Sequence, residues 1–196
     1  MKRIPWASSL ALVVLSSLGY AQDRPMVDLS LEEKRLAVVP EDARVQRNAV
    51  AFSPDGRTVA AVVVKSGREF LLLGDKKGAE FDEIMRLPVF SPDGRTVAYV
   101  ARSGANMRVV VGEKKGELFD DIGTPVFCPD GKTVVYRAKQ GRKQTIVIGE
   151  KKGELFDRVS HFIIGADTGT VAYAAEHRDA ATRRGKAYLM LGESKS

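Results

Sequence analysis

Basic side chains at recurring loop positions are the residues of this sequence best suited to bind a ligand. They lie between short apolar segments and would come together if those segments fold into one array of strands. The set is Arg47, Arg68, Arg86, Arg102, Arg108, Arg142, Lys143, His161, Arg183 and Arg184. Gathered on one face, these cations would bind an acidic protein surface, an anionic polymer or an anionic lipid headgroup. Ordinary solvated loop charge is the equally weighted alternative.

Catalytic and metal chemistry have little support in the sequence. The chain has two histidines, His161 and His177, and one cysteine, Cys128, and no Gly-x-Ser-x-Gly string marks a hydrolase nucleophile. His161 is the single candidate base for a cryptic hydrolase or lyase. The aspartates of a recurring Phe-Asp pair are too far apart along the chain to surround one cation. We therefore expect no catalytic residues, no metal and no cofactor.

The elements that carry these residues are set by an internal repeat. Phe52–Ala60 reads FSPDGRTVA, Phe90–Ala98 repeats it 38 residues later, and Phe127–Val135 reads FCPDGKTVV. A degenerate fourth copy, IGADTGTVA, begins at Ile164. A second motif, KKG followed by Phe-Asp, keeps the same spacing. Self-similarity near 37 residues is typical of a repeat architecture.

Each repeat contains four strand candidates. In the second copy these are residues 88–91, 96–103, 107–112 and 117–122, rich in Val, Ala and Tyr. A Ser-Pro-Asp-Gly turn separates the first two and a Lys-Lys-Gly turn the last two. The turn residues are Asp55, Gly56, Asp93, Gly94, Asp130 and Gly131. Four short antiparallel strands per repeat predict an all-β fold, a β-propeller of four-stranded blades.

The Phe-Ser-Pro-Asp-Gly-Arg-Thr-Val-Ala motif resembles the WD40-like repeat of TolB-type propellers. Similar repeats occur in the propellers of prolyl-oligopeptidase-type enzymes. The resemblance covers residues 41–196 and implies the propeller fold, whereas it says little about function. We expect neither the α/β domain that precedes the TolB propeller nor a peptidase domain.

The count of strands suggests how the blades could close into a ring. The fourth repeat has three strand candidates, and Glu41–Gln46 has the spacing of the strand that it lacks. We therefore predict that Glu41–Gln46 pairs with Lys186–Gly192 and closes a four-bladed ring, because closure removes exposed sheet edges. An eight-bladed ring of two chains and an open arc are the alternatives, so the oligomeric state stays open.

The N-terminus predicts export. Two basic residues precede an uncharged apolar run from Ile4 to Leu18, and small residues at Gly19 and Ala21 suit cleavage before Gln22. The run is short for a membrane span, so residues 1–21 read as a signal peptide. Residues 22–40 would be a lead-in with a possible short helix at Leu31–Val38, and residues 41–196 the propeller.

Together these features predict an exported, periplasmic or secreted protein. Without Lys2 and Arg3 the net charge falls from +6 to +4, too small for a dedicated nucleic-acid binder. The favoured function is a non-enzymatic protein-interaction scaffold in the cell envelope. A ligand- or polymer-binding module that uses the basic loop face is the alternative.

Overall fold

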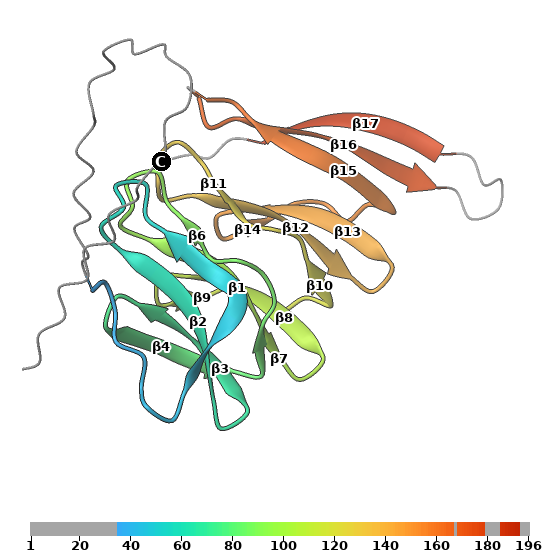
Figure 1. Ribbon diagram of the computed structural model, residues 1–196. Helices are drawn as coiled ribbons and strands as arrows, with labels where there is room; N and C mark the ends of the chain where they lie inside the picture. Colours follow the sequence, from blue (N-terminus) through green and yellow to red (C-terminus); the bar gives the residue numbers. More distant parts are fainter. Residues whose placement is uncertain (1–34, 167, 179–184, 193–196) are drawn as a thin grey trace, which may run out of the picture. The chain divides into compact units, whose positions relative to one another are not determined.

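The computed structural model describes residues 35–166, 168–178 and 185–192, and these contain strands and turns only (Figure 1). Within those residues no helix is long and apolar enough to cross a membrane. The described residues form one compact unit by their contacts. The segment expected to form a short helix falls partly outside the described residues, and residues 35–40 have no regular secondary structure.

The strands form four consecutive antiparallel sheets, which confirms the all-β, propeller-like prediction (Figure 1). Sheet one contains β1 (Arg44–Phe52), β2 (Val59–Lys65), β3 (Arg68–Leu73) and β4 (Lys76–Phe81). Sheet two contains β5 (Glu83–Ile84), β6 (Val89–Phe90), β7 (Val97–Ser103), β8 (Asn106–Val111) and β9 (Lys114–Lys115). Sheet three contains β10 (Asp121–Ile122), β11 (Val126–Phe127), β12 (Val134–Gln140), β13 (Lys143–Ile148) and β14 (Lys151–Lys152). Sheet four contains β15 (Arg158–Ile164), β16 (Val171–Arg178) and β17 (Gly185–Gly192).

The last strand of each repeat lies earlier in the chain than the sequence predicts. Lys114–Lys115, expected in a turn, is strand β9 and pairs with β8. The turn is the two-residue Gly112–Glu113, where a φ of 59° at Gly112 suits the first central position of a hairpin turn. Asp121–Ile122, expected to end the same blade, crosses to the next sheet and pairs with β12. The predicted strand 117–122 is therefore divided between two sheets.

The same shift shows that the predicted closing strand is wrong. Arg44 and Val45 belong to β1 and pair with Val64 and Val63 of β2, in sheet one. Arg44 corresponds to Glu83 of sheet two, because Glu83 pairs with Arg102 and Arg102 is the repeat counterpart of Val64. In the described part of the chain β17 pairs with β16 alone. The segment 41–46 thus begins the first sheet and does not complete the fourth, because the leading strand of every sheet starts before the Ser-Pro-Asp-Gly repeat.

Side chains within the Ser-Pro-Asp-Gly turns fix the hairpins that open each sheet. Asp93 accepts hydrogen bonds from the Ser91 hydroxyl at 2.6 Å and from the Arg95 N–H at 3.1 Å. These donors lower the pKa of Asp93, and Gly94 follows with a φ of 69°. Asp55 and Gly56 repeat the arrangement in sheet one. The recurring Asp and Gly therefore have a sufficient local role in the turn.

In sheet three Cys128 takes the place of the turn serine, and the aspartate finds another donor. The Thr133 hydroxyl donates to Asp130 at 2.6 Å, and the Lys132 and Thr133 N–H groups donate at 2.9 Å each. Partial burial raises the pKa of Asp130, but these hydrogen bonds outweigh it and the pKa is lowered. Gly131 adopts a φ of 68°, so the turn is preserved.

The central strands have apolar residues on both faces, and each face packs on a different sheet. On β7, Val97, Tyr99 and Ala101 belong to a buried cluster shared with sheet one. Ala98 and Val100 on the opposite face belong to the cluster shared with sheet three. A third cluster joins sheets three and four. The free energy of the fold therefore comes largely from apolar surface buried between sheets.

The Lys-Lys-Gly and Phe-Asp motifs build the joint between one sheet and the next. Phe119 packs edge-on against Tyr136 of sheet three, with ring centroids 6.3 Å apart, and Phe81 packs likewise on Tyr99 at 6.1 Å. A Cβ at Gly116 would lie 3.0 Å from the Val109 carbonyl oxygen and 3.6 Å from the Tyr136 hydroxyl. Burial raises the pKa of both Tyr99 and Tyr136 to about 12, so both rings stay neutral in the joint.

This joint yields a test of stability. Gly116→Ala should lower the free energy of unfolding by about 1–3 kcal/mol, because the new methyl group is too close to the Val109 carbonyl. Gly123→Ala is the matched control, since its Cβ would have only ordinary contacts, with the Arg137 carbonyl at 3.6 Å. Urea unfolding followed by circular dichroism measures both. Equal stability of the two variants would contradict the role given to Gly116.

Candidate functional site

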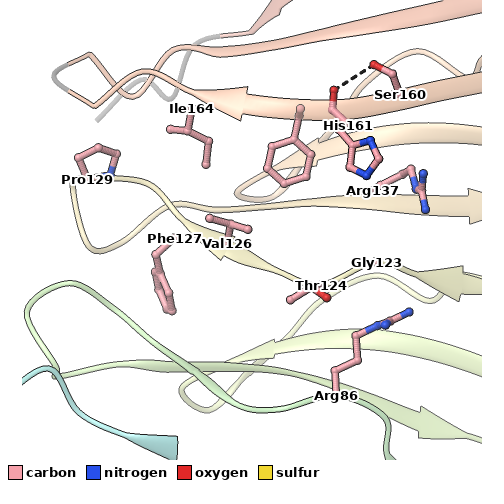
Figure 2. Close-up of a pocket in the computed structure, with 11 residues that line it drawn as sticks. Arg86, Gly123, Thr124, Val126, Phe127, Pro129, Arg137, Ser160, His161 and Ile164 are labelled. Atoms are coloured by element: carbon pink, nitrogen blue, oxygen red, sulfur yellow. Dashed lines mark hydrogen bonds between the residues drawn. The ribbon is translucent and has the colours of Figure 1, made fainter. Parts of the chain in front are cut away.

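A pocket of about 650 Å³ opens on the leading strands, the strand or pair of short strands that begins each sheet (Figure 2). Sheet two contributes Arg86, from the segment between β5 and β6. Sheet three contributes the β10–β11 segment and Arg137 of β12, and sheet four contributes residues 160–162 and Ile164 of β15. The three sheets meet here because every leading strand bends between two short paired segments.

Three basic side chains line this pocket: Arg86, Arg137 and His161. The Arg86 Nε donates a hydrogen bond to the Ile122 carbonyl at 3.2 Å, which ties sheet two to sheet three at the pocket wall. Arg137 is half-buried on a central strand. The described residues that line the pocket include no aspartate or glutamate. The pocket therefore concentrates positive charge without an internal counter-ion.

The rest of the lining is apolar with two hydroxyl groups. Val126, Phe127, Pro129, Phe162 and Ile164 supply the apolar surface (Figure 2). Thr124 and Ser160 supply the hydroxyls. The Ser160 hydroxyl donates to the His161 carbonyl at 3.0 Å and accepts from the Ala174 N–H at 3.1 Å. The pocket is thus suited to an anionic group attached to an apolar body.

Three other predicted cations lie at the hairpins that join β2 to β3, β7 to β8 and β12 to β13, and carboxylates pair with them. Arg68 pairs with Asp82, Arg102 with Glu83, and Lys143 with Asp157 at 2.8 Å. Arg47 and Arg142 are exposed. The Nε of Arg108 is buried and has no hydrogen-bond partner among the described residues. Arg183 and Arg184 lie outside the described residues.

The aspartates of the Phe-Asp motif bind backbone N–H groups of the following sheet. Asp82 accepts from the Gly104 N–H at 2.6 Å, Asp120 from Gly141 at 2.5 Å, and Asp157 from Arg178 at 2.8 Å. Each carboxylate thereby caps the hairpin of the next sheet, which explains the repetition of Asp after Phe. Within the described residues no three His, Cys, Asp or Glu side chains gather as a metal site.

Arg86 and His161, which the sequence assigned to the candidate binding face, do line one pocket. Arg137 was missed, although the repeat contains a signal for it. It lies 37 residues after the buried Val100, between the buried residues Tyr136 and Ala138 of β12. A cation in place of a buried valine in one repeat alone indicates a position with a separate role. Around His161 itself, no carboxylate of the described residues hydrogen-bonds to the ring.

Comparison with known proteins gives a fold likeness. No family model matches the chain, and no curated protein matches it in sequence. The structure is similar to two solved β-propeller proteins. TolB from Acinetobacter baumannii is 19% identical over 74% of this chain and 40% of TolB, with a TM-score of 0.45. The β-propeller domain of the Trilobed protease from Pyrococcus furiosus is 17% identical over 75% of this chain and 55% of that chain, with a TM-score of 0.48.

The repeat motif suggested a resemblance to TolB-type propellers, and the two similar structures are of TolB and of a protease propeller domain. The chain spans about half the length of the two structures or less. At this level of identity the likeness concerns the fold alone, so the function has to be argued from the residues of this chain.

The Asp157 cap predicts how stability depends on pH. Hydrogen bonds from Lys143 and from the Arg178 N–H lower the pKa of Asp157 from 3.8 to about 2. The stabilisation is therefore complete above about pH 4 and is lost as the pH falls toward 2. Asp157→Asn should melt at a lower temperature than the parent at pH 7, and the difference should shrink between pH 4 and pH 2.

Melting temperatures by circular dichroism from pH 7 to pH 2 measure this effect. Asp121→Asn is the control, because Asp121 is an exposed residue on β10. The control should follow the parent at every pH. A constant difference between Asp157→Asn and the parent across the whole range would contradict the assignment.

Proposed function

We propose that this protein is an exported, non-enzymatic binding module that acts as an interaction scaffold in the cell envelope. Its binding site is the pocket on the leading strands, and its partner presents an acidic protein segment. The signal-peptide pattern of residues 1–21 supports export. The observation that carries the proposal is a pocket with three basic side chains and no acidic lining residue in the described part of the chain.

The contrast between the two ends of the strands supports this choice of site. At the hairpin end, Arg68, Arg102 and Lys143 already have carboxylate partners, so an incoming anion would have to compete with them. In the pocket, neither Arg86 nor Arg137 has a carboxylate partner among the residues that the structure describes. A cation beside apolar surface attracts an anion more strongly than one in bulk water, because the local dielectric constant is lower.

The apolar lining favours a peptide over a simple inorganic anion. Phe127, Phe162 and Ile164 offer contact to side chains or aliphatic backbone next to a carboxylate. The lining comes from three sheets, so an extended segment would contact several leading strands at once. We therefore expect a partner that presents Glu or Asp beside apolar residues.

Paired substitutions test this function. The probe is a fluorescein-labelled peptide with alternating Glu and Leu residues, and binding is followed by fluorescence anisotropy at several salt concentrations. Arg86→Ala combined with Arg137→Ala should weaken binding by about tenfold or more, since each lost charge contact is worth roughly 1 kcal/mol. Binding by the parent should fall as salt rises, because salt screens the attraction.

Arg47→Ala combined with Arg142→Ala is the matched control, since it removes the same charge from exposed positions outside the pocket. This control should keep the parental affinity within about twofold. Equal binding by the pocket variant and the parent would overturn the proposed site. A preference for an anionic glycan of equal charge over the peptide would instead support the polymer-binding alternative.

A further inference from the structure

The two outer faces of the array, one on sheet one and one on sheet four, have exposed apolar residues that the repeat elsewhere buries. Twelve large hydrophobic residues are exposed in the described chain, and seven of them lie at these two outer faces. The sheet-one end has Val38, Val45, Val50 and Phe52, and the sheet-four end has Ile163, Leu189 and Leu191. Concentrated apolar surface of this kind marks an interaction site.

The sheet-four face is built like the faces that adjoin a following sheet. Leu189 and Leu191 on β17 pair with Ala174 and Ala172 of β16, so their side chains share the face opposite Tyr173. The corresponding residue of sheet three is Ile146, which sheet four buries to 1% exposure. Leu189 is 91% exposed and Leu191 77%. Sheet four therefore presents the surface on which another sheet packs elsewhere in the array.

The sheet-one face is built like the faces that adjoin a preceding sheet. Phe52 occupies the repeat position of Phe127, which packs between sheets two and three at 8% exposure, yet Phe52 is 61% exposed. Val50 and Phe52 pair with Ala61 and Val59 and lie on the same face. The two end faces are thus of different types. Sheet four presents the type of face that packs on a following sheet, and sheet one presents the type that packs on a preceding sheet.

The chain itself covers only part of the sheet-one face. Ala37, Val39 and Ala43 pack on Val63, Phe70 and Leu72. Val38, between two of these residues, is exposed, as are Val45, Val50 and Phe52. The covering segment thus still exposes the apolar side chain of Val38. The leading strand β1 remains uncovered at Val45, Val50 and Phe52.

We propose that a second copy of this chain covers both faces. The sheet-four face of each copy packs on the part of the other copy's sheet-one face that stays exposed, at Val45, Val50 and Phe52 and beside Val38. Such a head-to-tail contact forms a closed ring when the rotation between subunits permits it. Two copies would give eight sheets, within the range of known propellers.

The first measurement is the mass of the full chain in solution by light scattering and sedimentation, from 1 to 100 μM. We expect twice the chain mass. Leu189→Glu and Phe52→Glu should each give monomers, because each charge lies at both contacts of the dimer. Leu118→Glu, at an exposed apolar residue away from both end faces, is the control and should remain a dimer.

Mixing the variants distinguishes this geometry from a symmetric contact. In a head-to-tail pair, one Leu189→Glu chain and one Phe52→Glu chain together keep one contact with both original faces. An equimolar mixture should therefore regain a dimer, weaker than the parent, that neither variant forms alone. A dimer joined through the sheet-four faces only would instead survive Phe52→Glu and gain nothing on mixing.

Each remaining outcome also decides the matter. A parent that is monomeric at 100 μM, or that forms masses above the dimer, would overturn the two-chain ring. Circular dichroism checks that the variants fold, and Leu191→Ser and Val50→Lys replace any variant that does not. Dimers that persist in both replacements would overturn the proposal as well.

Discussion

The packing of an aromatic ring from the end of one sheet on a tyrosine in the middle of the next is the interaction on which the rest of this structure depends. Phe81 on Tyr99 and Phe119 on Tyr136 set the distance between adjacent sheets. The glycine before each Phe allows the tyrosine hydroxyl to approach the backbone. Because these contacts recur at a fixed spacing, the leading strands are brought together and a pocket can form between them.

The distribution of charge follows from the same joint. The aspartate after each Phe binds the hairpin of the following sheet, and Asp82 and Asp157 also pair with basic side chains nearby. These carboxylates therefore lie near the hairpins, where backbone N–H groups and basic side chains already bind them. The pocket at the leading strands has basic side chains and, among the described residues, no acidic ones. A chain of modest net charge thus acquires one locally cationic surface.

The sequence predicted the repeats, the antiparallel sheets and the tight turns well, because local apolar patterning and turn residues determine them. It placed the strand boundaries less well. Residues 117–122 looked like one strand, but Phe119 pairs with sheet two and Ile122 with sheet three, and only tertiary packing decides this division. The same error led to the predicted closing strand, since Glu41–Gln46 has the spacing of a last strand, whereas Val45 pairs with Val63 as part of a leading strand.

The candidate site was predicted only in part, for a related reason. Loop cations can be found in a sequence, but their partners cannot, and the ion pairs of Arg68, Arg102 and Lys143 depend on contacts across strands. Arg137 lies in a strand that reads as core, so a search among loops could not find it. Its departure from the repeat at a valine position was the available signal.

The offset between the sequence repeat and the sheet has a consequence for cooperativity. At the joints after sheets one and two, the fastening residues are contributed by two repeats, the Phe-Asp pair by one and the tyrosine by the next. A sheet that opened by itself would uncover apolar surface on both of its neighbours and release the hairpin that the preceding aspartate caps. With coupling of this strength between neighbouring sheets, the interfaces rather than the single sheets hold most of the stability. The unit that folds and unfolds should therefore be a pair of adjacent sheets or more.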